Sequence, residues 1–124
     1  MLITILQVLT AILIAIAMSM AFAHLLELRG KIRLSKGIYI AVHPIYYPGF
    51  TIGGAVEEFG GIVATIILLL LTPFSTPQFW LTRVALFGLI AMQIVFWFVT
   101  QPVNGFWLRA EKLGSAGAAF FSLG

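Results

Sequence analysis

Three long apolar stretches run along the chain, with shorter and more polar segments between them. The hydrocarbon core of a bilayer is roughly 30 Å thick, and a helix needs about 20 mostly apolar residues to cross it. Each stretch meets that length. The pattern therefore predicts three transmembrane helices, which we place at about residues 2–27, 51–72 and 79–101.

The second stretch contains two acidic residues, Glu57 and Glu58. A helix that began after them would cover only residues 59–71, which reach roughly 20 Å at about 1.5 Å per residue. That is too short to cross the membrane. We therefore expect both carboxylates to lie at or inside the membrane edge.

Composition supports a membrane protein. Only 9% of the residues are charged and 61% are hydrophobic, whereas an ordinary soluble domain has about 25% charged residues. The mean hydropathy is +1.10. A net charge of +3 that comes from so few charges does not indicate a nucleic-acid-binding face, so the expected partner is the lipid bilayer. With no cysteine, disulfides, thiolate metal sites and cysteine nucleophiles are excluded.

Charge also predicts how the helices are oriented. The segment between the first two helices carries the main basic cluster of the chain, Arg29, Lys31, Arg33 and Lys36, whereas residues 72–78 carry no charge. By the positive-inside rule the basic segment is cytoplasmic. We expect the N-terminus outside, the C-terminus in the cytoplasm, and a bacterial inner membrane as the location. Pro73 and Pro77 predict a tight antiparallel hairpin between the second and third helices.

Two other segments have a less regular pattern. Residues 29–50 form an expected basic and interfacial loop, because Pro44 and Pro48 interrupt a run of tyrosines and aliphatic residues that suits the headgroup layer. Residues 105–124 form an expected tail, and the whole chain is one domain. A cleaved signal peptide is the alternative for the first stretch, since residues 21–23 read Ala-Phe-Ala, although the apolar run exceeds the usual length of roughly 7–15 residues.

Polar residues gather where the three predicted helices end or begin on the cytoplasmic side. Because antiparallel helices bring these ends together, we expect one polar layer and a pocket there. It comprises His24, Glu27, Glu57, Glu58, Gln101 and Asn104. Small residues on each helix, such as the Gly60 and Ala64 pair, predict faces that pack closely in a membrane.

The acids of this layer have two interpretations. Glu57 and Glu58 can be structural, neutralised by Arg29, Arg33 or Arg109. Alternatively they form a metal or proton-transfer site with His24 and Glu27, which lie three residues apart on one helical face and supply nitrogen and oxygen ligands. No metal or cofactor can be assigned from these residues.

Two sequence runs resemble those of a known family. Residues 45–54 read Ile-Tyr-Tyr-Pro-Gly-Phe-Thr-Ile-Gly-Gly, and residues 100–108 contain Gln101-Pro102-Val103-Asn104 followed by Phe106-Trp107-Leu108. These runs are similar to small membrane proteins of the anthrone-oxygenase-like family. The resemblance implies a helical bundle and the oxygen-dependent oxidation of a polycyclic anthrone to a quinone, without an obvious bound cofactor. It makes His24 and Asn104 candidate site residues.

The family also has a fourth membrane helix, and this sequence stops at Gly124 before one. We therefore expect that a fourth helix is missing from the chain or is supplied by a partner.

Two functions follow as hypotheses. The first is a membrane-embedded, oxygenase-like enzyme for a hydrophobic aromatic or quinol-type substrate. Its catalytic candidates are Glu57 or Glu58 as proton acceptor and His24 as a second base or ligand. Its substrate-binding candidates are Trp97, as a stacking surface, Gln101 and Asn104. The second is a non-catalytic helical subunit that packs within a larger membrane complex or a homo-oligomer.

Overall fold

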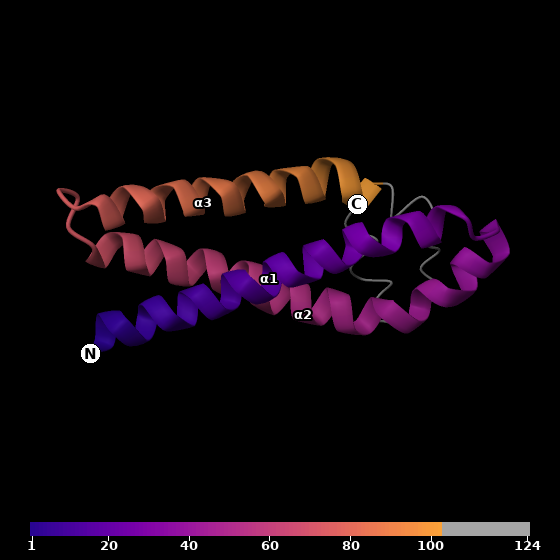
Figure 1. The fold of residues 1–124 in the computed structure, drawn as a ribbon, viewed down its shortest axis with the longest axis horizontal. Coiled ribbons are helices and arrows are strands. Elements are labelled where there is room, and N and C mark those ends of the chain that lie inside the picture. Colours follow the sequence, from indigo (N-terminus) through magenta and orange to yellow (C-terminus); the bar gives the residue numbers. More distant parts are fainter. Residues whose placement is uncertain (103–124) are drawn as a thin grey trace.

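Helices make up the described part of the protein. The computed structural model describes residues 1–102, except for the side chains of residues 43, 44 and 46–48. The elements are α1 (Leu2–Ile32), α2 (Lys36–Leu71), α3 (Pro77–Val95) and η1 (Phe96–Thr100), a π-helical turn that continues α3 (Figure 1). Asn104 and the expected tail lie outside the described residues.

Three segments are long and apolar enough to cross a membrane: Leu2–Ile32, Gly49–Leu71 and Pro77–Thr100. They overlap the three predicted spans closely. The prediction of an all-α integral membrane protein with three antiparallel transmembrane helices is confirmed.

The hairpin between α2 and α3 forms as Pro73 and Pro77 predict. The Thr72 hydroxyl donates to the Leu68 carbonyl at 2.7 Å at the end of α2, where Pro73 prevents a further turn. Thr76 caps α3, because its side-chain oxygen accepts a hydrogen bond from the Phe79 N–H at 3.4 Å, and Pro77 occupies the first turn. The short turn places α2 and α3 side by side.

The segment 29–50 differs from the expected loop. α1 continues to Ile32, α2 begins at Lys36, and Arg33–Ser35 alone connect them, so the α2 backbone is helical through Pro44 and Pro48. An interior proline costs roughly 3 kcal/mol. Both prolines precede Gly49, where the apolar spanning segment begins, and the helix continues through them into that segment.

Glycines of α2 face α1 at close range, as the small-residue pattern predicts. A Cβ atom built on Gly60 would lie 3.7 Å from Cδ1 of Leu13, and one on Gly53 would lie 3.5 Å from Cε of Met20. Ala17 of α1 and Ala64 of α2 are buried in the same interface. Close backbone approach through small residues is the usual way in which membrane helices pack.

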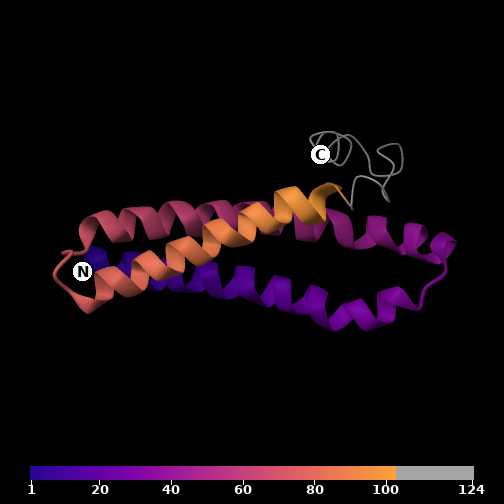
Figure 2. The same cartoon turned by 90° about the horizontal axis from the view of Figure 1, so that it is seen from above.

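α2 is the central helix of the bundle. α1 packs along α2 and α3 packs along α2, while contacts between α1 and α3 are sparse in the described residues. Figure 2 shows α3 crossing the α1–α2 pair at an angle, and the N-terminus lies at the same end of the bundle as the α2–α3 turn. We call the opposite end, around Arg33–Ser35, the basic end, and the end at residues 72–76 the turn end. Because α1 and α3 make few contacts with each other, a space lined by residues of all three helices lies between them over the face of α2, and we call it the wedge.

The Gly60 contact generates a test of the α1–α2 packing. Gly60→Ala should be tolerated, because a Cβ there meets Leu13 at an ordinary contact distance of 3.7 Å. Gly60→Leu should lower the free energy of unfolding in detergent by about 1–3 kcal/mol, since a large side chain must push the helices apart. Val63→Leu, at an exposed position one helical turn away, is the matched control and should have no measurable effect. Equal effects of the two leucine substitutions would contradict this packing.

Candidate functional site

A chain of two hydrogen bonds joins α2 to α3 in the interior of the bundle. The Gln93 side-chain amide donates from Nε2 to Glu58 Oε2 at 2.5 Å, and the Trp97 indole N–H donates to Gln93 Oε1 at 3.1 Å. Gln93 and Trp97 lie four residues apart, so they share one face of the helix. Of the two adjacent acids of α2, Glu58 is thus the one that is hydrogen-bonded to α3.

Glu58 lies deep in the membrane-spanning part of α2. It is nine residues from Gly49, where the spanning segment begins, which corresponds to roughly 13 Å at about 1.5 Å per residue. Placing a charged carboxylate at that depth costs free energy unless the group is hydrogen-bonded, ion-paired or protonated. The hydrogen bond from Gln93 meets one of these conditions.

Glu57 points elsewhere, into the α1–α2 interface. Its Oε1 would lie 3.7 Å from a Cβ built on Gly53, the glycine that faces Met20 of α1. Its Oε2 is buried and has no hydrogen-bond partner among residues 1–102. In that part of the chain neither Glu57 nor Glu58 forms a salt bridge. The pairing expected with Arg29 or Arg33 is therefore not found, and Arg109 lies outside the described residues.

His24 and Glu27 form a separate group nearer the basic end. Glu27 pairs with Lys31, with 2.6 Å between Oε2 and Nζ, and His24 Nδ1 lies 3.9 Å from the same oxygen. The His24 ring also contacts the Phe50 ring, with 4.4 Å between centroids. Glu27 thus has a cationic partner, Lys31, that we did not predict from the sequence.

The two groups do not share one depth, contrary to the single polar layer that we expected. Phe50 lies level with His24, and Glu58 is eight residues further along α2, a separation of roughly 12 Å along the helix axis. The cause is the three-residue connection between α1 and α2, which brings His24 opposite Phe50 rather than opposite the acids. Within the described residues, no three His, Cys, Asp or Glu side chains are grouped for a metal ion.

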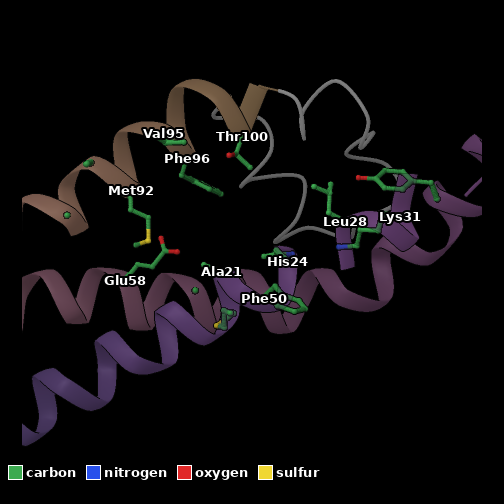
Figure 3. A pocket seen from close by; sticks show the side chains of 15 residues that line it. Ala21, His24, Leu28, Lys31, Phe50, Glu58, Met92, Val95, Phe96 and Thr100 are labelled. Atoms are coloured by element: carbon green, nitrogen blue, oxygen red, sulfur yellow. The ribbon is translucent and has the colours of Figure 1, made fainter. Parts of the chain in front are cut away.

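A pocket occupies the wedge between α1 and α3 (Figure 3). Its volume is about 760 Å³, within the range of roughly 300–1,000 Å³ that is usual for small-molecule sites. Glu58 and Met92 point toward one another at the turn-side part of the pocket in Figure 3, and His24 and Phe50 line it nearer the basic end. Lys31 and Tyr39 also line the pocket on that side.

Small residues make room for the pocket. Gly54, Gly88, Ala21 and Ala91 line it, and a Cβ built on Gly88 would meet nothing within 4 Å. Met20, Met92 and Phe96 supply most of the larger apolar surface. The wall around Glu58 is therefore apolar except for the carboxylate itself.

The π-helical turn η1 shapes the wall at the end of α3. Phe96 begins this turn, Thr100 ends it, and both line the pocket. In an α-helix four residues overshoot one full turn by roughly 40°, whereas the wider π turn removes this overshoot. Gln101 is thereby brought back toward the face that carries Gln93 and Trp97, and it is fully buried. Single π-helical turns within α-helices are frequent at functional sites.

The predicted site residues are thus only partly brought together. Glu58 and His24 line one pocket; Glu57 lies behind it, Trp97 and Gln101 are beside it, and Asn104 lies outside the described residues. Trp97 contacts Gln93 through its N–H rather than lining the pocket with its ring. In the sequence Gln93, Trp97 and Gln101 follow one another at four-residue spacings, which places them on one stripe of a helix. The sequence does not show that Gln93 donates to Glu58.

Comparisons with known proteins give no assignment: no protein-family model, no curated protein and no solved structure matches the chain. The argument for function therefore depends on the site itself.

The hydrogen bond between Gln93 and Glu58 can be tested by a double-mutant cycle. Gln93→Leu should lower the free energy of unfolding by about 1–3 kcal/mol, because it leaves a carboxylate without its donor. Glu58→Leu combined with Gln93→Leu should cost less than Gln93→Leu alone, since both polar partners are then replaced. Gln78→Leu, at an exposed position of α3, is the control and should change stability by less than about 0.5 kcal/mol. Strictly additive effects would show that the two side chains do not interact.

Proposed function

We propose that the chain is a membrane-embedded, oxygenase-like enzyme that binds a hydrophobic aromatic or quinol-type substrate in the pocket between α1 and α3. One observation carries this proposal: Glu58 is the one carboxylate among the described lining residues of a pocket of about 760 Å³, it lies in the apolar turn-side part of that pocket, and a side-chain amide holds one of its oxygens. The resemblance to the anthrone-oxygenase-like family supports the same reaction class.

In the proposed reaction Glu58 is the base. It removes a proton from the substrate carbon or hydroxyl, and the electron-rich anion that results reacts with dioxygen. For an anthrone, one molecule of substrate and one of dioxygen give one quinone and one water. A positioned general base contributes roughly a hundredfold to ten-thousandfold to such a proton transfer. The aliphatic, thioether and aromatic side chains of the pocket suit a flat hydrophobic ring system.

His24 has a different place in this proposal. Its separation from Glu58 of roughly 12 Å along the axis is too great for both groups to act on one proton. It lines the pocket between Glu58 and the basic end, apart from the group that takes the proton.

The purified full-length protein should consume dioxygen when an anthrone is supplied. Glu58→Gln keeps the size of the side chain but removes the base, so it should lower the rate by about a hundredfold or more. Glu57→Gln should lower it far less, because Glu57 lies outside the pocket. Oxygen uptake and quinone absorbance measure the reaction, and elemental analysis of the same sample detects bound iron or manganese. A large loss in Glu57→Gln with none in Glu58→Gln would transfer the role to Glu57.

A second candidate function is that of a non-catalytic subunit. The α3 helix favours it, because in the described residues α3 packs mainly on α2, and its small residues Ala85, Gly88 and Ala91 are exposed. Small residues on a membrane helix are suited to contact with another helix. If the protein neither consumes dioxygen nor binds the substrate, and co-purifies stoichiometrically with a larger membrane complex, this function replaces the enzyme.

We further propose that the basic end faces the cytoplasm and that the membrane is a bacterial inner membrane. Arg29, Arg33 and Lys36 are exposed at that end, whereas the turn end carries no charge between Thr72 and Gln78. An excess of Lys and Arg on cytoplasmic segments is the usual determinant of orientation.

Cysteine labelling tests the orientation. A cysteine at Ser35 should react with a membrane-impermeant maleimide only after the cytoplasmic side is opened, and one at Ser75 should react in intact cells, since both serines are exposed. The native chain has no cysteine, so the background is clean. The reverse pattern would invert the orientation.

A further inference from the structure

Trp97 determines how the Gln93 amide is turned. An indole N–H only donates hydrogen bonds, so the atom of Gln93 that faces Trp97 at 3.1 Å must be the carbonyl oxygen, Oε1. The amide NH₂ group is then forced to the other side, where it donates to Glu58 Oε2. The Glu58 carboxylate can only accept, so it favours the same orientation, and the amide is held from both sides.

The Glu58 carboxylate consequently has one occupied and one available oxygen. Oε2 accepts from Gln93, and Oε1 forms no hydrogen bond within the described part of the chain. Because Glu58 lines the pocket, Oε1 is the atom that a bound molecule meets.

The turn-side part of the pocket therefore offers an acceptor and no donor. Its other described lining residues are Gly54, Gly88, Ala91 and Met92, none of which has a side-chain hydrogen-bond donor. The donors that line the pocket, on His24, Lys31, Tyr39 and Thr100, lie toward the basic end.

We infer that this half of the pocket selects a ligand that donates a hydrogen bond, a phenol, enol or quinol hydroxyl, and discriminates against the corresponding ether or carbonyl. The inference rests on the proposed function in taking the pocket as the ligand site, and it adds the hydrogen-bond class of the ligand. A hydroxyl donates to Glu58 Oε1. A carbonyl oxygen placed there faces a carboxylate oxygen, so two acceptors meet without a proton between them.

Trp97 is a positioning residue for this selectivity. When its N–H is absent, the Gln93 amide is held by Glu58 alone, so it is less rigidly placed and its NH₂ group can also reach a molecule in the pocket. The site then offers a donor as well as an acceptor, and the discrimination between hydroxyl and carbonyl should fall.

The experiment measures the binding of matched, unreactive probes to the full-length protein in lipid nanodiscs at neutral pH. The probes are 2-naphthol and 2-methoxynaphthalene, which share a ring system and differ in the donor, together with 1,4-naphthoquinone, which has only acceptors. Empty nanodiscs correct for partition into lipid. We expect 2-naphthol to bind at least about tenfold more tightly than the other two, as a hydrogen bond to a charged group is worth that much.

Two variants link the selectivity to the named groups. Glu58→Gln should reduce the preference for 2-naphthol toward one, because an amide can both donate and accept. Trp97→Phe keeps a ring but removes the N–H, and should reduce the preference at least about threefold. Trp80→Phe is the matched control, because Trp80 is exposed near the turn end and lies outside the pocket. Thermal unfolding of each variant shows that the bundle is intact.

The outcomes separate the two proposals. If no probe binds above the empty-nanodisc level, the pocket is not a ligand site and the proposed function fails with it. If all three probes bind equally well, the pocket remains a ligand site and the selectivity inference is overturned. If Trp97→Phe leaves the preference unchanged while Glu58→Gln abolishes it, Glu58 keeps its role and the positioning role of Trp97 is wrong.

Discussion

The packing of both outer helices against α2 determines where the polar side chains of this protein lie. Short connections at each end, Arg33–Ser35 and residues 72–76, force α1 and α3 to run antiparallel to α2. Glycines on α2 then draw α1 close, while α3 joins α2 mainly from the turn end. The two outer helices consequently diverge from each other, and the space between them is the pocket.

The charged and polar side chains that face this space determine its chemistry. Two adjacent acids enter the membrane on α2, but consecutive residues of a helix point in directions about 100° apart. Glu57 therefore faces α1 and Glu58 faces α3, where Gln93 is available to donate. One acid is enclosed between two helices, and the other is left with an oxygen toward the pocket. Sequence neighbours thus acquire different chemistry from helix geometry alone.

Features that depend on residues close together in the sequence could be predicted, whereas features that depend on packing between distant residues could not. The three spans and the Pro73 hairpin were predictable, because hydrocarbon excludes unsatisfied backbone groups and proline ends a helix. The continuation of α2 through Pro44 and Pro48 was not, because proline disfavours an interior helical position and the sequence does not show what offsets that cost.

The positions of the polar side chains could not be predicted from the sequence either. Their depth depends on the length of the α1–α2 connection, which the sequence overestimates because residues 29–50 have the composition of an interfacial loop. The Gln93 stripe was visible, but the rotation of α3 relative to α2 was not. That rotation decides which acid meets Gln93, and it depends on side-chain packing between residues 35 positions apart.

On the proposed function, the geometry also constrains where the proton goes. Oxidation of an anthrone to a quinone by dioxygen releases no net proton, because both hydrogens that the substrate loses end in the water. The proton that Glu58 takes at Oε1 must therefore return to the reduced oxygen. Gln93 cannot accept that proton, because its carbonyl is occupied by Trp97 and its NH₂ group faces Oε2. The protonated carboxyl group consequently donates toward the pocket, and delivery of the proton as water forms leaves Glu58 as a carboxylate for the next substrate. Glu58 is therefore both the base and the acid of the proposed cycle.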